Sequence, residues 1–258
     1  MDFPRKELLE KYIRLRDRYI EPYTPDFEVS GGEDRYVKFN DAVEGLNPYN
    51  RFVTPRLLNK KATFPTLTRT KLTKNADPRN YVRLRYDSDG VLRAAHLAEY
   101  NGEEAAYVYV SKQLTIGYMR STVPGTDRAR QFEFEWCEYD DEGRLRSVEH
   151  FQKNNGMFST GIIINCEYYE YDGSTITRAW RFEDFETHPM QQTIALALQF
   201  VPDRILNPNQ FEFTFRRTAD GLDYTRNHFY RRSQTITHEG HVDQAMLDNL
   251  AENGIRLV

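Results

Sequence analysis

Histidine is the side chain in this sequence best suited to acid–base chemistry or metal binding near neutral pH, and three of the six histidines occupy related positions. His150 and His228 each lie seven residues after a glycine that closes an acidic turn, and His96 lies six residues after such a glycine. Trp180 lies seven residues after Gly173, the remaining turn glycine. If the strands close into a barrel, the three imidazoles converge. In an open sheet they form a row of half-buried polar side chains, the interpretation that we favour.

A second pair, His238 and His241, stands three residues apart, a spacing that would bring both rings to one ion on a helix. The HExxH pattern is absent and Gly240 disfavours a helix, so we expect a loop there. The sequence also lacks a G-x-S-x-G nucleophile elbow, a phosphate loop and a dinucleotide fingerprint. We therefore expect neither cofactor nor metal and favour a non-enzymatic role. An enzyme that uses His96, His150 and His228 is kept as the second alternative.

Four aromatic segments of alternating pattern would position these residues. The clearest spans residues 132–152, in which Phe132, Phe134 and Trp136 alternate with glutamates before the acidic turn at 140–143. An acidic residue followed by glycine is a strong hairpin signal, because the turn needs a positive φ that glycine accepts without penalty. The other three turns are centred on Gly90, Gly173 and Gly221.

Two of these turns share one template. Tyr86-Asp-Ser-Asp-Gly90-Val-Leu92 and Tyr139-Asp-Asp-Glu-Gly143-Arg-Leu145 both read Tyr, Asp, two variable residues, Gly, one variable residue and Leu. The opening recurs at Tyr171-Asp-Gly173 and the close at Asp220-Gly221-Leu222. The template resembles the YD-type hairpin of RHS-family repeat proteins and of smaller bacterial proteins built of tandem hairpins. The resemblance covers these four segments, under half of the chain, and implies a meandering antiparallel sheet and a role beside secreted toxins.

The expected fold is mainly β: an antiparallel meander or partly closed barrel of tandem hairpins, with an N-terminal helix and a short C-terminal helix. Residues 1–30 are expected to form the first helix and a linker, and residues 31–258 the β domain, within one structural domain. The C-terminal helix is expected from about Val242, with Met246 and Leu250 on one face and Gly254 at its end. The apolar face of the first helix is expected to comprise Leu8, Leu9, Tyr12, Ile13, Tyr19 and Ile20.

Residues 51–80 lack a strong period and carry eight Lys and Arg residues against Asp77 alone. Residues 66–74 alternate weakly, which favours an edge strand guarded by charge. The alternative is a basic contact surface that includes Arg69, Lys71 and Lys74. Residues 193–201 alternate as a strand would, but their alanines favour a helix, so that segment stays ambiguous.

Charge and composition narrow the class of partner. The chain has a net charge of −4, which gives no case for nucleic-acid binding, and no apolar run approaches the roughly 20 residues of a membrane helix. Residues 1–18 lack the apolar core of a signal peptide, so a cytoplasmic protein without membrane contact is expected. The two cysteines, Cys137 and Cys166, fall in expected strands and are interpreted as free, buried thiols.

Residues 132–186 hold 13 acidic against five basic residues, and they are rich in aromatic side chains. Such a surface suits a basic protein partner, since complementary charge speeds encounter and sets specificity. We therefore expect a protein-binding module, with an immunity protein that neutralises a basic bacterial toxin domain as the concrete hypothesis. The first alternative is a lipocalin-like barrel that binds a small apolar ligand or chromophore. The expected binding residues are Trp136, Glu138, Asp140, Asp141, Glu142 and Trp180, together with Arg69, Lys71 and Lys74.

Overall fold

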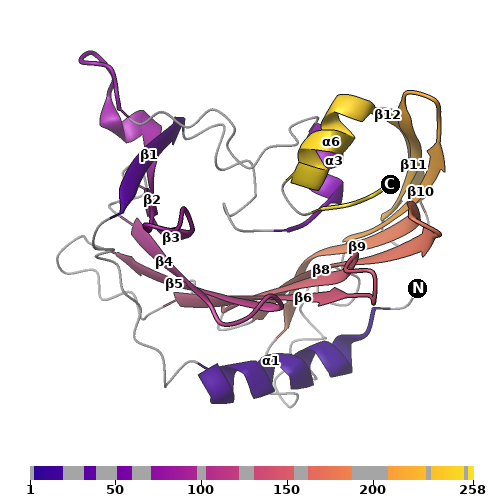
Figure 1. Cartoon of the computed structure of the whole chain (residues 1–258). Coiled ribbons are helices and arrows are strands. Elements are labelled where there is room, and N and C mark those ends of the chain that lie inside the picture. Colours follow the sequence, from indigo (N-terminus) through magenta and orange to yellow (C-terminus); the bar gives the residue numbers. More distant parts are fainter. Residues whose placement is uncertain are drawn as a thin grey trace. The chain divides into compact units, whose positions relative to one another are not determined.

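The computed structural model describes residues 3–19, 32–38, 51–59, 71–97, 103–121, 131–153, 162–187, 209–230, 234–252 and 255–258. Within these ranges twelve strands form one sheet whose strand order follows the sequence, from β1 to β12 (Figure 1). Neighbouring strands run antiparallel wherever their register is described. Because β1 and β12 stand at opposite ends of this order, the sheet is an open meander. The predicted antiparallel β fold is confirmed, in its open form.

The first five strands are β1 (Glu33–Lys38), β2 (Tyr81–Tyr86), β3 (Leu92–Leu97), β4 (Glu103–Tyr109) and β5 (Leu114–Ser121). They are followed by β6 (Gln131–Tyr139), β7 (Leu145–Lys153), β8 (Ile162–Asp172) and β9 (Thr175–Thr187). The last three are β10 (Asn209–Arg217), β11 (Gly221–Tyr230) and β12 (Gln234–Asp243). The helical elements are α1 (Arg5–Tyr19), α3 (Thr54–Asn59), the 3-10 turn η1 (Pro78–Asn80) and α6 (Gln244–Glu252).

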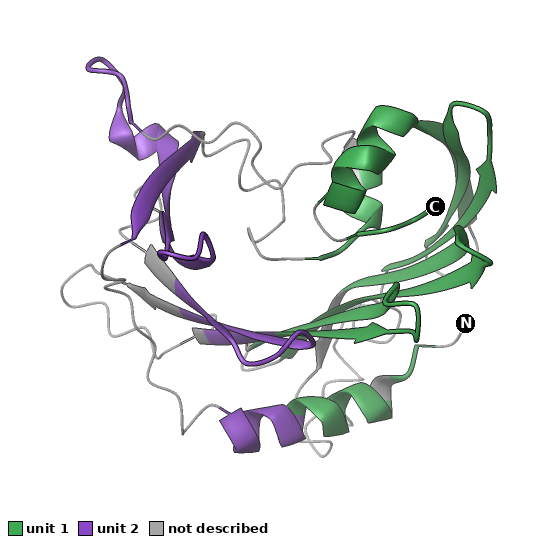
Figure 2. Cartoon of the chain, in the orientation of Figure 1, with its two compact units in different colours: residues 1–12, 51–63, 135–258 green, residues 13–50, 64–134 purple. Residues whose placement is uncertain are grey.

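The chain divides into two compact units (Figure 2). Unit 1 comprises residues 1–12, 51–63 and 135–258, and unit 2 comprises residues 13–50 and 64–134. Each unit has buried side chains of its own and is described by itself.

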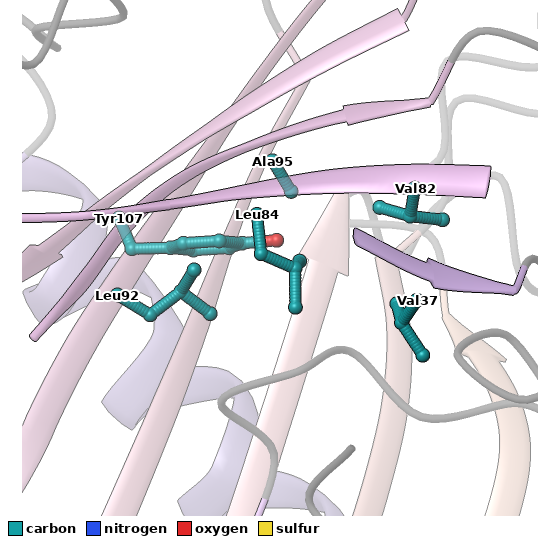
Figure 3. Close-up of a cluster of buried hydrophobic side chains, with 6 residues drawn as sticks. All are labelled: Val37, Val82, Leu84, Leu92, Ala95 and Tyr107. Carbon is teal, nitrogen blue, oxygen red and sulfur yellow. The ribbon is translucent and has the colours of Figure 1, made fainter. Parts of the chain in front are cut away.

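A hydrophobic cluster on β1 to β4 stabilises unit 2 (Figure 3). In β2 the buried residues Val82 and Leu84 alternate with the half-buried arginines Arg83 and Arg85, as the sequence pattern predicts for a strand with one face in the core. Burial of such side chains contributes about 1.5–3 kcal/mol each. The cluster comprises Val37, Val82, Leu84, Leu92, Ala95 and Tyr107.

Helix α1 forms as predicted, but its buried face differs from the expected one. Leu8, Tyr12 and Leu15 are buried, whereas Ile13 is 39% exposed. In unit 1 the Tyr12 ring packs against Phe151 of β7 at a centroid distance of 6.2 Å. Leu8 and Tyr12 belong to the expected face, but the buried stripe continues through Leu15 and not Ile13, because residues at i, i+4 and i+7 share one helical face.

The shared turn template has a local physical cause. In the β6–β7 turn the Asp140 carboxylate accepts hydrogen bonds from the Arg144 backbone N–H at 2.8 Å and its Nε–H at 2.7 Å. In the β2–β3 turn Asp87 accepts from the Val91 backbone N–H at 2.9 Å and from Arg93 Nε–H at 2.7 Å. The turn glycines, Gly90 and Gly143, have φ values of 75° and 78°. The aspartate therefore closes the turn and glycine supplies its left-handed residue.

At the C-terminal end the predicted short helix is confirmed, whereas the loop expected at residues 238–241 is wrong. Residues 238–241 lie in β12 rather than in a loop, paired with β11. Helix α6 begins at Gln244. The preceding residue, Asp243, is its N-cap, because Asp243 Oδ1 accepts a hydrogen bond from the Met246 backbone N–H at 2.9 Å. The helix buries Leu247 and Leu250, while Met246 is only half-buried. Gly254 lies outside the described residues.

Gly221 differs from the other turn glycines. It is buried, its φ is not positive, and a Cβ atom there would overlap the Val242 carbonyl oxygen of β12. Glycine is needed at this position because the two strands approach closely.

The long segment without a strong period is partly helical. Residues 54–59 form α3, which the sequence pattern did not predict. Residues 71–74 are not in a strand, so the described end of the expected edge strand is wrong. Residues 66–70 and the ambiguous segment 193–201 lie outside the described residues.

Candidate interaction surface

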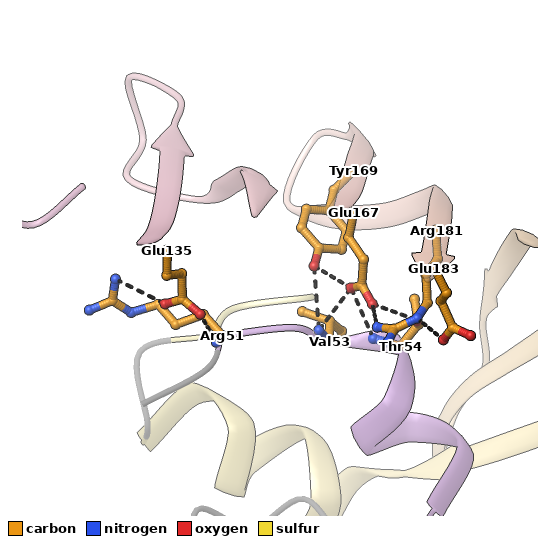
Figure 4. A network of polar contacts seen from close by, with 8 residues as sticks. All are labelled: Arg51, Val53, Thr54, Glu135, Glu167, Tyr169, Arg181 and Glu183. Carbon is orange, nitrogen blue, oxygen red and sulfur yellow. Dashed lines mark hydrogen bonds and ion pairs between the residues drawn. The ribbon is translucent and has the colours of Figure 1, made fainter. Parts of the chain in front are cut away.

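A fully buried carboxylate on β8 holds the start of α3 in unit 1 (Figure 4). Glu167 accepts hydrogen bonds from the Val53 N–H at 2.9 Å, the Thr54 N–H at 3.1 Å and Thr54 Oγ1–H at 2.6 Å. Backbone N–H groups at a helix start have no partner within the helix, and a carboxylate satisfies them. Glu167 thus acts as a cap supplied by a strand more than a hundred residues later.

The same carboxylate neutralises a buried cation. The Arg181 guanidinium on β9 binds both Glu167 and Glu183, and the Tyr169 hydroxyl donates to Glu167. Burial opposes the charge of Arg181, but the two carboxylates outweigh it and raise the pKa of Arg181. Arg181 also lies 4.9 Å from the Phe52 ring centroid, which adds a cation–π contact. This buried network fixes residues 52–54 against β8 and β9.

A second glutamate holds the preceding residue. Glu135 of β6 is fully buried and accepts a hydrogen bond from the Arg51 backbone N–H at 2.9 Å, with the guanidinium 3.9 Å away. Burial opposes ionisation of Arg51, yet Cys137 and Glu135 raise its pKa. Burial also raises the pKa of the Cys137 thiol, so this cysteine stays protonated near neutral pH. Cys137 and Cys166 are free and buried, as predicted.

The sequence pattern did not reveal this network. Alternation assigned Phe132 and Phe134 to one face of β6 and Glu133 and Glu135 to the other, and all four side chains are buried. The glutamates find their partners through contacts between distant segments, for which an alternating strand pattern carries no signal.

Four residues meet on the other face of the sheet in unit 1, two of which, Trp136 and Glu138, are expected binding residues. Because Val148 pairs with Glu167, the next residue, Glu149, projects from the opposite face. There Lys11 Nζ of α1 lies 2.5 Å from Glu149 Oε2 and 3.3 Å from Glu138 Oε1. The same ammonium lies 5.6 Å from the Trp136 ring centroid, and Trp136 Nε1–H donates to Glu138 at 3.3 Å.

This arrangement leaves Glu138 available at the surface, since its side chain is 52% exposed. Glu149 is 6% exposed, and burial raises its pKa although Lys11 opposes the shift. The predicted pair Trp136 and Glu138 is therefore brought together, on a face that α1 partly covers.

The acidic turns of unit 1 form a corner that we define as Asp141, Glu142 and Asp172, all exposed. Arg144 connects the two turns, since its guanidinium binds Glu142 and donates to the Gly173 carbonyl oxygen. It also lies 4.9 Å from the Tyr171 ring centroid. Asp140, by contrast, closes its own turn and is only half-buried. The acidic corner is thus held in place by side chains of both hairpins.

The remaining expected binding residues are placed differently. Trp180 is 7% exposed, and the Arg178 guanidinium lies 5.4 Å from its ring centroid. The indole is therefore buried beneath a charged side chain. Lys71 and Lys74 are exposed in unit 2. Arg69 lies outside the described residues.

The histidines do not share a site within unit 1. His150 is buried, with its ring 6.3 Å from the Phe52 ring, and His228 stacks on Phe211 at 4.3 Å. Their strands, β7 and β11, are four positions apart in the sheet, a separation of about 19 Å along it. His96 belongs to β3 of unit 2. Among the described residues there is no group of three or more His, Cys, Asp or Glu side chains arranged to hold a metal ion.

His238 and His241 also diverge. They lie in β12 at an odd spacing, so their side chains project from opposite faces. His241 Nδ1 instead lies 2.9 Å from Asp223 Oδ1 on β11.

Comparison with known proteins does not assign this chain to a class. No protein-family model matches it, and no curated protein matches it. Among the described helices, none is long and apolar enough to cross a membrane.

Proposed function

We propose that this chain is a non-catalytic protein-binding module that binds a basic protein partner through the acidic corner. The observation that carries the proposal is the bridging of two hairpin turns by Arg144, in which Asp141, Glu142 and Asp172 are exposed. A charged surface that is already ordered loses little conformational entropy when it binds.

The buried polar groups support the same proposal. Glu135 and Glu167 satisfy backbone donors, and Arg181 is neutralised by two carboxylates. These groups are buried with their structural partners, whereas Asp141 and Glu138, the latter bonded to Lys11 and Trp136, are exposed and accessible to another molecule. Among the described strands the sheet is open, so they do not form the closed barrel that the lipocalin-like alternative requires.

Affinity purification with the full chain as bait tests the proposal. The bait variant Glu142→Lys with Asp172→Lys should lose a basic protein that the wild-type chain retains, at least tenfold by quantitative mass spectrometry. The matched control is Asp89→Lys, which changes the residue at the same template position of the β2–β3 turn. A partner set unchanged by the double reversal, or reduced equally by Asp89→Lys, would contradict the proposal.

Within this class we propose the more specific role of a cytoplasmic immunity protein that neutralises a basic toxin domain. Its support is the resemblance of two turns to YD-type hairpins and the exposed acidic corner. Co-expression of the chain with the captured partner should restore bacterial growth that the partner alone arrests. Growth arrest that persists with the wild-type chain would rule out this role and leave protein binding itself standing.

A further inference from the structure

Among the described strands, β12 is an edge strand with a partner on one side only. It is the last strand of the open sheet, and among the described strands it pairs only with β11. Five consecutive side chains along it, from Thr235 to Glu239, are exposed. An edge strand presents a row of backbone donors and acceptors to which another strand can pair. Over its ten residues, β12 is long enough for a regular strand pairing.

Hydrophobic exposure gathers at the same hairpin. Within the described part of the chain three large hydrophobic side chains are exposed, and two of them are Ile236 at 54% and Phe229 at 37%. Ile236 pairs with His228, and Phe229 pairs with Thr235, so the two lie on opposite faces near one end of the β11–β12 hairpin. A strand added at this edge would cover Ile236 directly, whereas Phe229 lies one strand further in.

The opposite end of the strand order is protected in a way that β12 is not. β1 has only six residues, and Glu33, Asp34, Arg35 and Lys38 are charged. Asp34 is paired with Arg85 of β2 at 2.8 Å. Short length and charge are the usual means by which edge strands avoid pairing. From Gln234 to Val242, β12 has neither lysine, arginine nor proline.

We propose that β12 pairs antiparallel with β12 of a second copy of this chain, about a two-fold axis at Thr237. A two-fold axis normal to the sheet keeps each face on its own side, so it must pass through a residue position. At Thr237 it places Ile236 opposite His238 of the second copy, and Thr235 opposite Glu239 of the second copy.

Neighbouring registers are less favourable. An axis at Glu239 opposes two carboxylates, and like charges directly opposite each other destabilise a sheet. An axis at His238 opposes two imidazoles and leaves Ile236 against Gly240, which has no side chain to cover it. The Thr237 register avoids both. It does not involve the acidic corner, so the self-pairing and the proposed function fail or succeed separately.

The first experiment measures the mass of the full chain by sedimentation equilibrium. The wild-type chain should have twice the monomer mass at micromolar concentration, and Ile236→Lys should raise the dissociation constant at least about tenfold. The control is Ile13→Lys, which changes the same type of side chain, 39% exposed on α1, and should leave the mass unchanged. A wild-type chain that is monomeric would overturn the proposal, even if its β12 edge binds a foreign peptide.

A disulfide tests the register. In Thr237→Cys the two new thiols face each other across the axis, within the 4.4–6.8 Å Cα separation that a disulfide spans. In Thr235→Cys the two thiols are displaced by about 13 Å along the strands and should not join. Cys137 and Cys166 are buried and do not compete. Oxidation should therefore give a covalent dimer on a non-reducing gel only for Thr237→Cys. Equal yields of covalent dimer from the two variants would overturn the register. A non-covalent dimer in which neither variant forms the disulfide would overturn the edge pairing.

Discussion

At the scale of single residues, the distinctive feature of unit 1 is that buried carboxylates accept hydrogen bonds from backbone N–H groups, in the place of backbone carbonyl oxygens. Glu167 satisfies two backbone N–H groups at the start of α3 and one guanidinium, and Glu135 satisfies one further N–H group. An ionised group away from water is tolerated when its hydrogen-bonding capacity is filled. Such a carboxylate is therefore expected to matter more for stability than any exposed acid on the same strand.

The variant Glu167→Gln tests this difference. The amide keeps the shape of the side chain but loses the charge that neutralises Arg181. Its NH₂ group is also a hydrogen-bond donor and cannot accept from the backbone N–H groups of Val53 and Thr54. We expect the free energy of unfolding to fall by about 3 kcal/mol, measured by urea denaturation. The control, Glu170→Gln, changes a 53% exposed acid on the same strand and should cost less than about 0.5 kcal/mol. Equal costs for the two variants would contradict the structural role of Glu167.

The buried Glu149 gives a pH dependence with a defined sign. Burial raises the pKa of Glu149 above 4.5, its ordinary value, despite the opposing charge of Lys11. The protonated form is thus favoured in the folded state, and its stabilising contribution is full below the unfolded pKa and is lost as pH rises through the folded pKa. Relative to Glu149→Gln, the wild-type chain should lose stability in urea titrations as pH rises from about 4 through the raised pKa of Glu149. A difference that stays constant or grows over this range would contradict the raised pKa.

At the scale of elements, the hairpins of the fold were predictable and two other elements were not. The β2–β3 and β6–β7 turns are specified by residues within seven positions, because Asp87 and Asp140 bond to their own turns. α3 depends on Glu167, which lies 113 residues from Thr54. β12 contains Gly240, where a Cβ atom would overlap the Tyr224 ring of β11, so its strand form depends on a neighbour and not on its own pattern.

The same distinction limits how much of the candidate site could be predicted. Asp141 and Glu142 lie at a turn tip that alternation and turn chemistry indicate. Trp180 looked like an exposed interface residue, but neighbouring strands bury it to 7% exposure. Sequence periodicity assigns a residue to a face of its own strand, whereas burial of that face is decided by segments elsewhere in the chain.

Substitutions at Gly90 and Gly221 distinguish a glycine that is needed for its positive φ from one that is needed because two strands approach closely. Gly90 has φ of 75° and open space around its Cα, so Gly90→Ala should cost only the left-handed backbone penalty of about 1–2 kcal/mol. Gly221→Ala should cost more, because its Cβ would overlap Val242 O and push β12 away. Replacement by asparagine, which tolerates positive φ, should recover part of the stability at position 90 and none at 221. Thermal unfolding of the four variants checks this, and recovery by asparagine at 221 would contradict the steric explanation.

At the scale of the whole molecule, charge is distributed unevenly. Residues 132–186 carry −8, and because the whole chain carries −4, the remaining residues carry +4. Part of the acidic excess is interior, since Glu133, Glu135, Glu149 and Glu167 are buried. The exposed acids, including the acidic corner, account for the field that an approaching partner meets. A low net charge therefore coexists with a locally negative surface in unit 1.

This distribution predicts how binding to the captured basic partner responds to salt. Attraction between exposed charges is screened beyond about 8 Å at physiological ionic strength. The association rate of the wild-type chain should therefore fall about tenfold or more as NaCl rises from about 50 mM to about 500 mM. The dissociation rate should change much less, because it depends mainly on short-range contacts.

Stopped-flow measurements on charge variants connect this response to particular residues. The double variant Glu142→Lys with Asp172→Lys should associate more slowly at low salt and lose most of the salt dependence, since the attracting charges are gone. Asp89→Lys changes the net charge by half as much, in the other unit, and should keep at least half of the wild-type slope. If net charge alone controlled encounter, the slopes of the variants would follow charge and not position. An association rate independent of salt for the wild-type chain would contradict electrostatic recognition through the acidic corner altogether.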